Sequence, residues 1–209
     1  MIVDLTSLAL AAALSAQASV PQIALPPAPP SPALVEAVSR VGLGDLPDVV
    51  LIGYPVTGRS PGAIRESMNA ARPTIEVDGA RHDARTGWIY QTRWRNGSDD
   101  ACLPATATVT VVLRMVLPDL TTRDQLSPPE KAGWDAYFEA LVTHERNHGR
   151  IAVAGRDQMQ AAMRASPTCE AMNAMIETTS AEVRAASEEY DRQTDHGRRE
   201  GAVYPRPGA

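Results

Sequence analysis

Apolar and polar residues alternate along two stretches in the middle of the chain, a period that predicts half-buried β-strands. The first stretch covers residues 88–94 and the second covers residues 105–117. Between them, residues 96–99 read Asn-Gly-Ser-Asp, a composition typical of a turn, and Pro118 is expected to end the second strand. We therefore predict two strands that pair in antiparallel fashion.

Three further elements are predicted upstream of this strand pair. Apolar and β-branched residues at 49–54 indicate a strand that stops at Pro55. Ser60 and Pro61 provide the N-cap and the first residue of a helix, which must end before Pro73. Residues 33–41 are expected to form a short helix.

The longest helical pattern begins after the second alternating stretch. Ser127 and Glu130 have the spacing of a capping box, and Ser166-Pro167 is expected to end the helix near Ala165. An apolar stripe recurs along it at helical spacing, through Trp134, Phe138, Leu141, Ala152, Met159 and Met163.

A second helix is predicted from about Cys169 to Tyr190, with apolar residues again three and four positions apart. The short link between the two helices allows them to lie antiparallel. The expected fold class is therefore α+β, a small antiparallel sheet packed on a long two-helix hairpin.

The amino-terminal part of the chain differs in composition. Residues 1–18 hold an apolar run followed by Ala16-Gln17-Ala18, which is typical of a secretion signal, although Asp4 stands where a signal usually carries Lys or Arg. A short membrane anchor or a different start of the chain are the alternatives. Residues 19–46 are expected to form a proline-rich linker and a weakly structured segment, and residues 47–209 a single domain.

Charge excludes two classes of partner. The net charge is −5, and the sequence shows no cluster of Lys and Arg of the kind that binds nucleic acid or a membrane surface. No segment is long and apolar enough to predict stable membrane insertion after the signal is removed. The expected location is therefore secreted or periplasmic.

The chain has two cysteines, Cys102 at the start of the second alternating strand and Cys169 at the start of the last helix. In an exported protein an even number of cysteines indicates a disulfide. The alternative, metal binding through thiolates, requires a second cysteine near each one, which the sequence lacks. We therefore predict that the two form a bond that joins the sheet to the helical hairpin.

The long helix carries His144, Glu145 and His148, an H-E-x-x-H sequence. Residues four apart lie on one face of a helix, so both imidazoles can bind one cation. Glu145 would lie beside the cation and take a proton from the water bound to it. We predict a Zn²⁺ site here, because ionisable groups on an apolar stripe are costly unless they are paired or bind a metal. The alternative is a core histidine pair with a buried partnership between Glu145 and Arg146.

A catalytic zinc ion usually has three protein ligands and one open position. His196 is the preferred third ligand, because it follows the last helix, whose antiparallel course returns the chain to the first. Glu170 and Glu177 on that helix are alternatives, and so is direct binding by Asp191.

Further expectations concern the surroundings of the metal. A ligand histidine needs an acceptor for its second ring nitrogen, and Asp191 is the candidate, unless it only caps the loop. Thr194 and Gly197 are expected to form a tight turn that supports the site. His82, in a polar stretch, is expected to take no part in metal binding, although it could line the cleft as a donor to the transition state.

The chain resembles a known family, the bacterial predicted secreted zinc-dependent proteases, which are catalogued largely as a domain of unknown function. The resemblance rests on residues 54–58, the strand 88–94, Cys102, Pro118, Trp134, Phe138, His144-Glu145-x-x-His148 and Tyr190-Asp191-x-x-Thr194-x-His196-Gly197. It implies a zincin-like active-site helix and a metallopeptidase acting on a peptide or protein substrate.

Together the sequence favours a zinc-dependent peptidase outside the cytoplasm. Two other functions stay open: a metal-dependent hydrolase of another bond in the cell envelope, and a catalytically silent domain that a metal stabilises.

Overall fold

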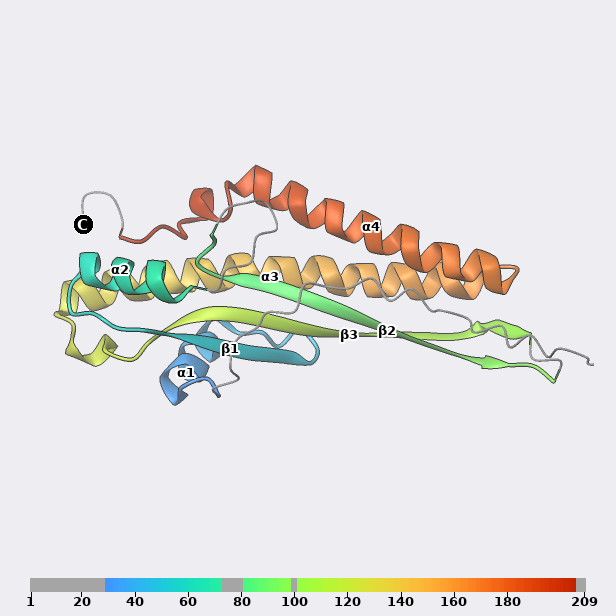
Figure 1. Ribbon diagram of the computed structural model, residues 1–209, viewed down its shortest axis with the longest axis horizontal. Helices are drawn as coiled ribbons and strands as arrows, with labels where there is room; N and C mark the ends of the chain where they lie inside the picture. The colour runs from blue at the N-terminus through green and yellow to red at the C-terminus, as the bar shows by residue number, and fades with distance from the viewer. Residues whose placement is uncertain (1–28, 73–80, 99–100, 206–209) are drawn as a thin grey trace, which may run out of the picture.

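The computed structural model describes residues 29–72, 81–98 and 101–205. The predicted signal peptide and the start of the proline-rich segment lie outside these residues. The described chain is elongated, with the strands and two long helices running along the same direction (Figure 1).

Within the described residues, three strands form one sheet in the order β1–β3–β2. Their bounds are Val49–Val56 for β1, Arg85–Asn96 for β2 and Cys102–Leu120 for β3. β2 and β3 pair in antiparallel fashion as predicted, but β1 lies parallel to β3, so the expectation of a wholly antiparallel sheet is wrong. The parallel strands β1 and β3 are joined by a connection that contains helix α2, Pro61–Ala71, and strand β2, and parallel neighbours need a connection of such length.

Two strands continue past the prolines that were expected to end them. Pro55 lies within β1, which is an edge strand. A proline is tolerated there because one side of an edge strand has no neighbouring strand to which an N–H would donate. Pro118 lies in β3 beyond Val116, the last β3 residue that pairs with β2, so β3 has already lost one neighbour there.

The helical hairpin forms as predicted from α3, Pro128–Ala165, and α4, Cys169–Thr194. The capping box at the start of α3 is present, with the Ser127 N–H donating to the Glu130 carboxylate at 3.1 Å. α4 lies along α3 and reaches four residues beyond its predicted end at Tyr190 (Figure 1).

One face of the sheet packs against α3. Val109, Val111, Leu113 and Met115 of β3 are buried there, while Thr108, Thr110 and Arg114, which alternate with them, are exposed, as predicted. The Tyr90 hydroxyl of β2 donates to the Ala152 carbonyl of α3 at 2.7 Å. The short helix α1, Pro32–Val41, covers another part of the core with Leu34 and Val38.

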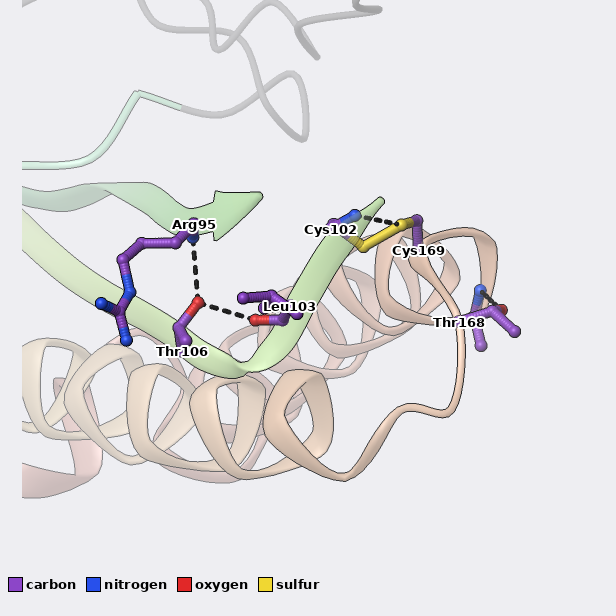
Figure 2. Close-up of a disulfide and its surroundings, with 7 residues drawn as sticks. Arg95, Cys102, Leu103, Thr106, Thr168 and Cys169 are labelled. Carbon is purple, nitrogen blue, oxygen red and sulfur yellow. Dashed lines mark hydrogen bonds between the residues drawn. A yellow bond between two sulfur atoms is a disulfide. The ribbon is translucent and has the colours of Figure 1, made fainter. Parts of the chain in front are cut away.

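The predicted disulfide is present between Cys102 and Cys169, which are 67 residues apart. It joins the start of β3 to the start of α4, at the end of the hairpin where the loop connects α3 and α4 (Figures 1 and 2). The Cys102 N–H also donates to the Cys169 sulfur at 3.2 Å. The bond therefore ties the sheet to the helical hairpin, as expected.

In the part of the chain that the structure describes, no helix combines the length and the apolar character that crossing a bilayer requires.

Candidate metal centre

The H-E-x-x-H residues lie on the buried side of α3, as their place in the apolar stripe predicts. His144, Glu145 and His148 are 3%, 4% and 6% exposed. Burial of three ionisable side chains in succession is costly unless each finds a partner or a cation, so their surroundings decide what the site can hold.

The two histidines and Asp191 of α4 converge on one point. The Nε2 atoms of His144 and His148 lie 3.2 Å apart, and the Oδ1 atom of Asp191 lies 3.2 Å from the first and 3.1 Å from the second. Ligand atoms at about 2.0–2.1 Å from a tetrahedral zinc ion are separated by about 3.3 Å from one another. The three side chains therefore have the mutual spacing of ligands of one small cation.

The remaining ring nitrogens are held from outside this triangle. The Nδ1 atom of His144 lies 2.8 Å from Glu200 Oε2, and the Nδ1 atom of His148 lies 2.8 Å from Ser187 Oγ. Since a carboxylate can only accept, Nδ1 of His144 carries the proton when the ring is neutral, and Nε2 presents its lone pair to the triangle. Such partners orient metal-binding histidines and fix their tautomer.

Charge in the cluster favours a cation. Burial lowers the pKa of His144, but the Asp191 carboxylate, Glu145 and Glu200 outweigh it, so the net shift of that pKa is upward. The site therefore attracts positive charge, which either a proton on His144 or a metal ion between the side chains can supply.

Glu145 differs from the two histidines because its carboxylate is not fully bonded. Among the described residues, its buried Oε2 atom has no hydrogen-bond partner, while its backbone carbonyl accepts from the Thr86 hydroxyl of β2 at 3.0 Å. Burial raises the pKa of Glu145, an effect that the neighbouring His148 and His144 reduce. A buried carboxylate with a free oxygen beside a ligand cluster is suited to bind and move a proton.

The chain turns sharply after α4 and returns to His144. Asp195, His196 and Gly197 all have left-handed backbone conformations, with φ of 52°, 50° and 79°. A Cβ atom at Gly197 would lie 3.0 Å from Cγ of His144, so glycine allows the close approach. Thr194 stabilises the turn, because its hydroxyl donates to the Tyr190 carbonyl and accepts from the Gly197 N–H.

The turn is followed by a short 3-10 helix, Arg198–Glu200, which places Glu200 against the site. Besides holding His144, Glu200 accepts from the Tyr190 hydroxyl at 2.7 Å. The Tyr190 ring stacks on the His144 ring with centroids 5.0 Å apart and planes at 20°. The cluster is thereby enclosed on the side of α4.

His196 lies beside the triangle rather than in it. Its Nδ1 atom is 3.6 Å from Asp191 Oδ1, and its side chain is 41% exposed, against 4% for His144. The group of ligand atoms within 4.8 Å of one another contains His144, His148 and Asp191. The other two carboxylates considered as third ligand, Glu170 and Glu177, lie nearer the disulfide end of α4, 21 and 14 residues before Asp191.

His82, which precedes β2, lies against His196. The two ring centroids are 4.5 Å apart and the planes are inclined by 34°. Its neighbour Asp83 accepts from Tyr137 at 2.9 Å and from Arg65 at 2.7 Å, which fixes the segment before β2 against α3 and α2.

Sequence reasoning did not identify Ser187 or Glu200 as part of the site, and it named Tyr190 only in the motif that carries the family resemblance, without a role. Ser187 had a signal, because it stands four residues before Asp191 on α4, the spacing that places His144 and His148 on one face of α3. Glu200 had none, since its position depends on the left-handed turn that precedes it.

A comparison of the chain with models of known families gives a match. Residues 53–197 match DUF922, described as a bacterial protein of unknown function. The chain belongs to the DUF922 family. The matched residues include both histidines of α3, Asp191 and His196, whereas Glu200 lies just beyond them. No curated protein matches the chain, and no solved structure does.

Proposed function

We propose that this DUF922 protein is a zinc-dependent peptidase that acts outside the cytoplasm. In this proposal His144, His148 and Asp191 hold the ion, and Glu145 is the general base. The observation that carries it is the convergence of two Nε2 atoms and one carboxylate oxygen, 3.1–3.2 Å apart, beside a buried glutamate with a free oxygen. His196 remains the alternative third ligand that the sequence favours.

The donor set suits zinc. Two imidazole nitrogens and one carboxylate are common ligands of catalytic zinc, and both histidines have partners at Nδ1 that leave Nε2 for the ion. Without a cation, the lone pairs of two Nε2 atoms and a carboxylate oxygen would face one another, an arrangement that a shared proton relieves only in part.

Zinc bound here would supply a Lewis acid that lowers the pKa of a water molecule and polarises a substrate carbonyl. The chain's own contribution is to handle the proton. Glu145 Oε2 is available to accept the proton of the attacking water and then to return it to the leaving amine, which breaks the peptide C–N bond. His144 and His148 are held in place by Glu200 and Ser187 while this occurs.

Two observations bear on the alternatives. The three proposed ligands come from two helices, α3 and α4, so a bound ion would also join these helices. This first observation is equally consistent with a metal that only stabilises the fold. The partly unbonded Glu145 favours catalysis, because a purely structural site has no use for a buried carboxylate beside its ligands. The disulfide supports a location outside the cytoplasm.

The test is zinc analysis and peptide digestion with the parent protein, Glu145→Gln and the matched control Glu139→Gln, an exposed carboxylate on the same helix. We expect about one zinc ion per chain in all three proteins. Cleavage of a peptide library, followed by mass spectrometry, should fall about 10²- to 10⁴-fold in Glu145→Gln alone.

Each outcome selects one function. A parent that binds no zinc, or a Glu145→Gln protein that cleaves as fast as the parent, would refute the proposal. Zinc that raises the melting temperature of a protein without cleavage of library peptides or of cell-envelope amides would identify a structural metal. Cleavage of envelope amides alone would identify the non-peptidase hydrolase.

A further inference from the structure

We propose that His196, supported by His82, is a catalytic residue that donates a hydrogen bond to the oxygen of the scissile carbonyl, and that it is not a metal ligand. This inference rests on the proposed peptidase function and adds a role for the two histidines that the ligand set leaves unused.

The first argument is position. The Nδ1 atom of His196 lies 3.6 Å from Asp191 Oδ1, the same oxygen that faces both Nε2 atoms. His196 is 41% exposed in its side chain, whereas the side chains of His144 and His148 are 4% and 7% exposed. It therefore borders the ligand cluster on its solvent side, from which a substrate can approach.

The second argument is backbone conformation. His196 has φ of 50°, and Asp195 before it has φ of 52°, a region that residues with a Cβ atom rarely adopt. Residues held in such conformations cost stability and cluster at functional sites. Here the left-handed conformation of His196 itself directs its ring back along α4 toward Asp191.

The third argument is the rigid support on the other side. The His82 ring lies 4.5 Å from the His196 ring, although 114 residues separate them. Asp83 is fixed by Tyr137 and Arg65, and Thr86 is bonded to the backbone of Glu145. The residues that follow His82 are thus anchored to α2 and α3, and the His82 ring limits the positions open to His196.

The chemistry follows from this placement. As water adds to a peptide carbonyl, negative charge develops on the carbonyl oxygen, and a preorganised N–H donor near it stabilises the transition state. The His196 imidazole can provide that donor. The ring keeps its proton in this step, because it forms a hydrogen bond and breaks none of its own covalent bonds.

The test compares His196→Gly with Asp195→Gly. Both changes relieve a left-handed residue, so both should raise the melting temperature, but only the first removes an imidazole. His82→Ala, and His82→Gln, which keeps a side-chain N–H donor at that position, complete the set. The measurements are zinc affinity by chelator competition, kcat and KM on the best-cleaved library peptide, and affinity of the zinc-loaded protein for a phosphinic analogue of that peptide.

We expect zinc affinity within about threefold of the parent in every variant. His196→Gly should lower kcat by about 10²- to 10³-fold with little change in KM. It should lower the affinity of the zinc-loaded protein for the phosphinic peptide by a similar factor. Asp195→Gly should retain the parent kcat. His82→Ala should lower kcat by about tenfold, and His82→Gln should recover part of that loss.

Two results would overturn the inference and leave the proposed function standing. One is a fall in zinc affinity of 100-fold or more in His196→Gly, which would make His196 a ligand. The other is an unchanged kcat in that variant. A parent protein that binds no zinc or cleaves no peptide would instead overturn the proposed function, and this inference with it.

Discussion

Glu200 Oε2 lies 2.8 Å from Nδ1 of His144, although the two residues are 56 positions apart and Glu200 belongs to a short 3-10 helix after α4. The same carboxylate accepts from Tyr190, whose ring stacks on His144. Glu200 therefore holds the edge of the His144 ring directly, and it holds the Tyr190 ring that stacks on the face of His144.

Glu200→Ala is expected to weaken zinc binding by about 10- to 100-fold, because the His144 ring loses the acceptor that sets its tautomer. The matched control is Glu188→Ala, which removes an exposed carboxylate from α4. Chelator competition measures both. Equal zinc affinities for the two variants would show that Glu200 only closes the turn.

The contact between α3 and α4 depends on Gly155. A Cβ atom there would lie 2.2 Å from Val183 Cγ2 of α4 and 2.6 Å from the Tyr90 hydroxyl of β2. Gly155→Ala should therefore lower the free energy of unfolding by about 1–3 kcal/mol, as overpacking does. Gly133→Ala, on the same helix with nothing within 4 Å of the added atom, should raise it by about 0.5–1 kcal/mol. Urea denaturation separates the two, and a stabilising Gly155→Ala would mean that α4 moves away easily.

Local pattern predicted most of this fold. The helix start at Ser127 and Glu130 and the alternation of β3 are decided by neighbouring residues, so they could be predicted without a tertiary context. The parallel pairing of β1 could not, because nothing within residues 49–56 specifies which strand lies beside them.

The candidate site shows the same limit. His144, Glu145 and His148 were found because they share one turn of one helix. The second helix was expected to end at Tyr190, but it continues to Thr194. Asp191 therefore stays on the helix, on the face that is turned toward His144 and His148 of α3. The left-handed turn then places His196 at the solvent-exposed side of the cluster formed by His144, His148 and Asp191. Predicting which side chain completes the cluster of His144 and His148 therefore required the exact end of a helix, the least reliable feature of a sequence pattern.

The disulfide should contribute much of the stability of the end of the molecule distant from the site. Closing a 67-residue loop in the unfolded chain is worth about 4 kcal/mol in the chain-entropy model. Replacing both cysteines by Ala should lower the free energy of unfolding by about that amount, and reductant should lower it equally in the parent. Urea denaturation with and without dithiothreitol measures this. Two reactive thiols in the unreduced, exported protein would contradict the bond itself.

Asp45 connects the loop that precedes β1 to helix α3, since its carboxylate accepts from Arg150 at 2.6 Å and from Arg146 at 2.8 Å. The Arg150 hydrogen bond, with Arg146, lowers the pKa of Asp45 from 3.8 to about 2. A depressed folded-state pKa adds stability above pH 4 that is lost as the pH falls toward 2. Because the carboxylate is 38% exposed, solvent screening limits this to about 1 kcal/mol or less. Asp45→Asn should remove that part of the acid dependence in urea titrations at pH 2–6, and an unchanged profile would contradict it.

The roles of Asp191 and His196 can be separated by their effects on zinc binding. Asp191 Oδ1 faces the Nε2 atoms, and the Nδ1 atoms already have Glu200 and Ser187 as partners, so Asp191 stands where a ligand stands rather than behind one. Asp191→Asn should therefore weaken zinc binding by more than the roughly 100-fold that bounds loss of a supporting residue, while His196→Ala should leave it nearly unchanged.

The sequence alone favours the reverse order, with His196→Ala the more damaging change. Chelator competition on both variants decides between the two orders, with circular dichroism to confirm that each protein is folded. If His196→Ala loses zinc and Asp191→Asn loses only 10- to 100-fold in affinity, His196 is the third ligand and the aspartate supports it. The side chain of His196 would then have to turn inward when the ion binds, because its Nδ1 atom stands 3.6 Å from Asp191 Oδ1 and outside the triangle.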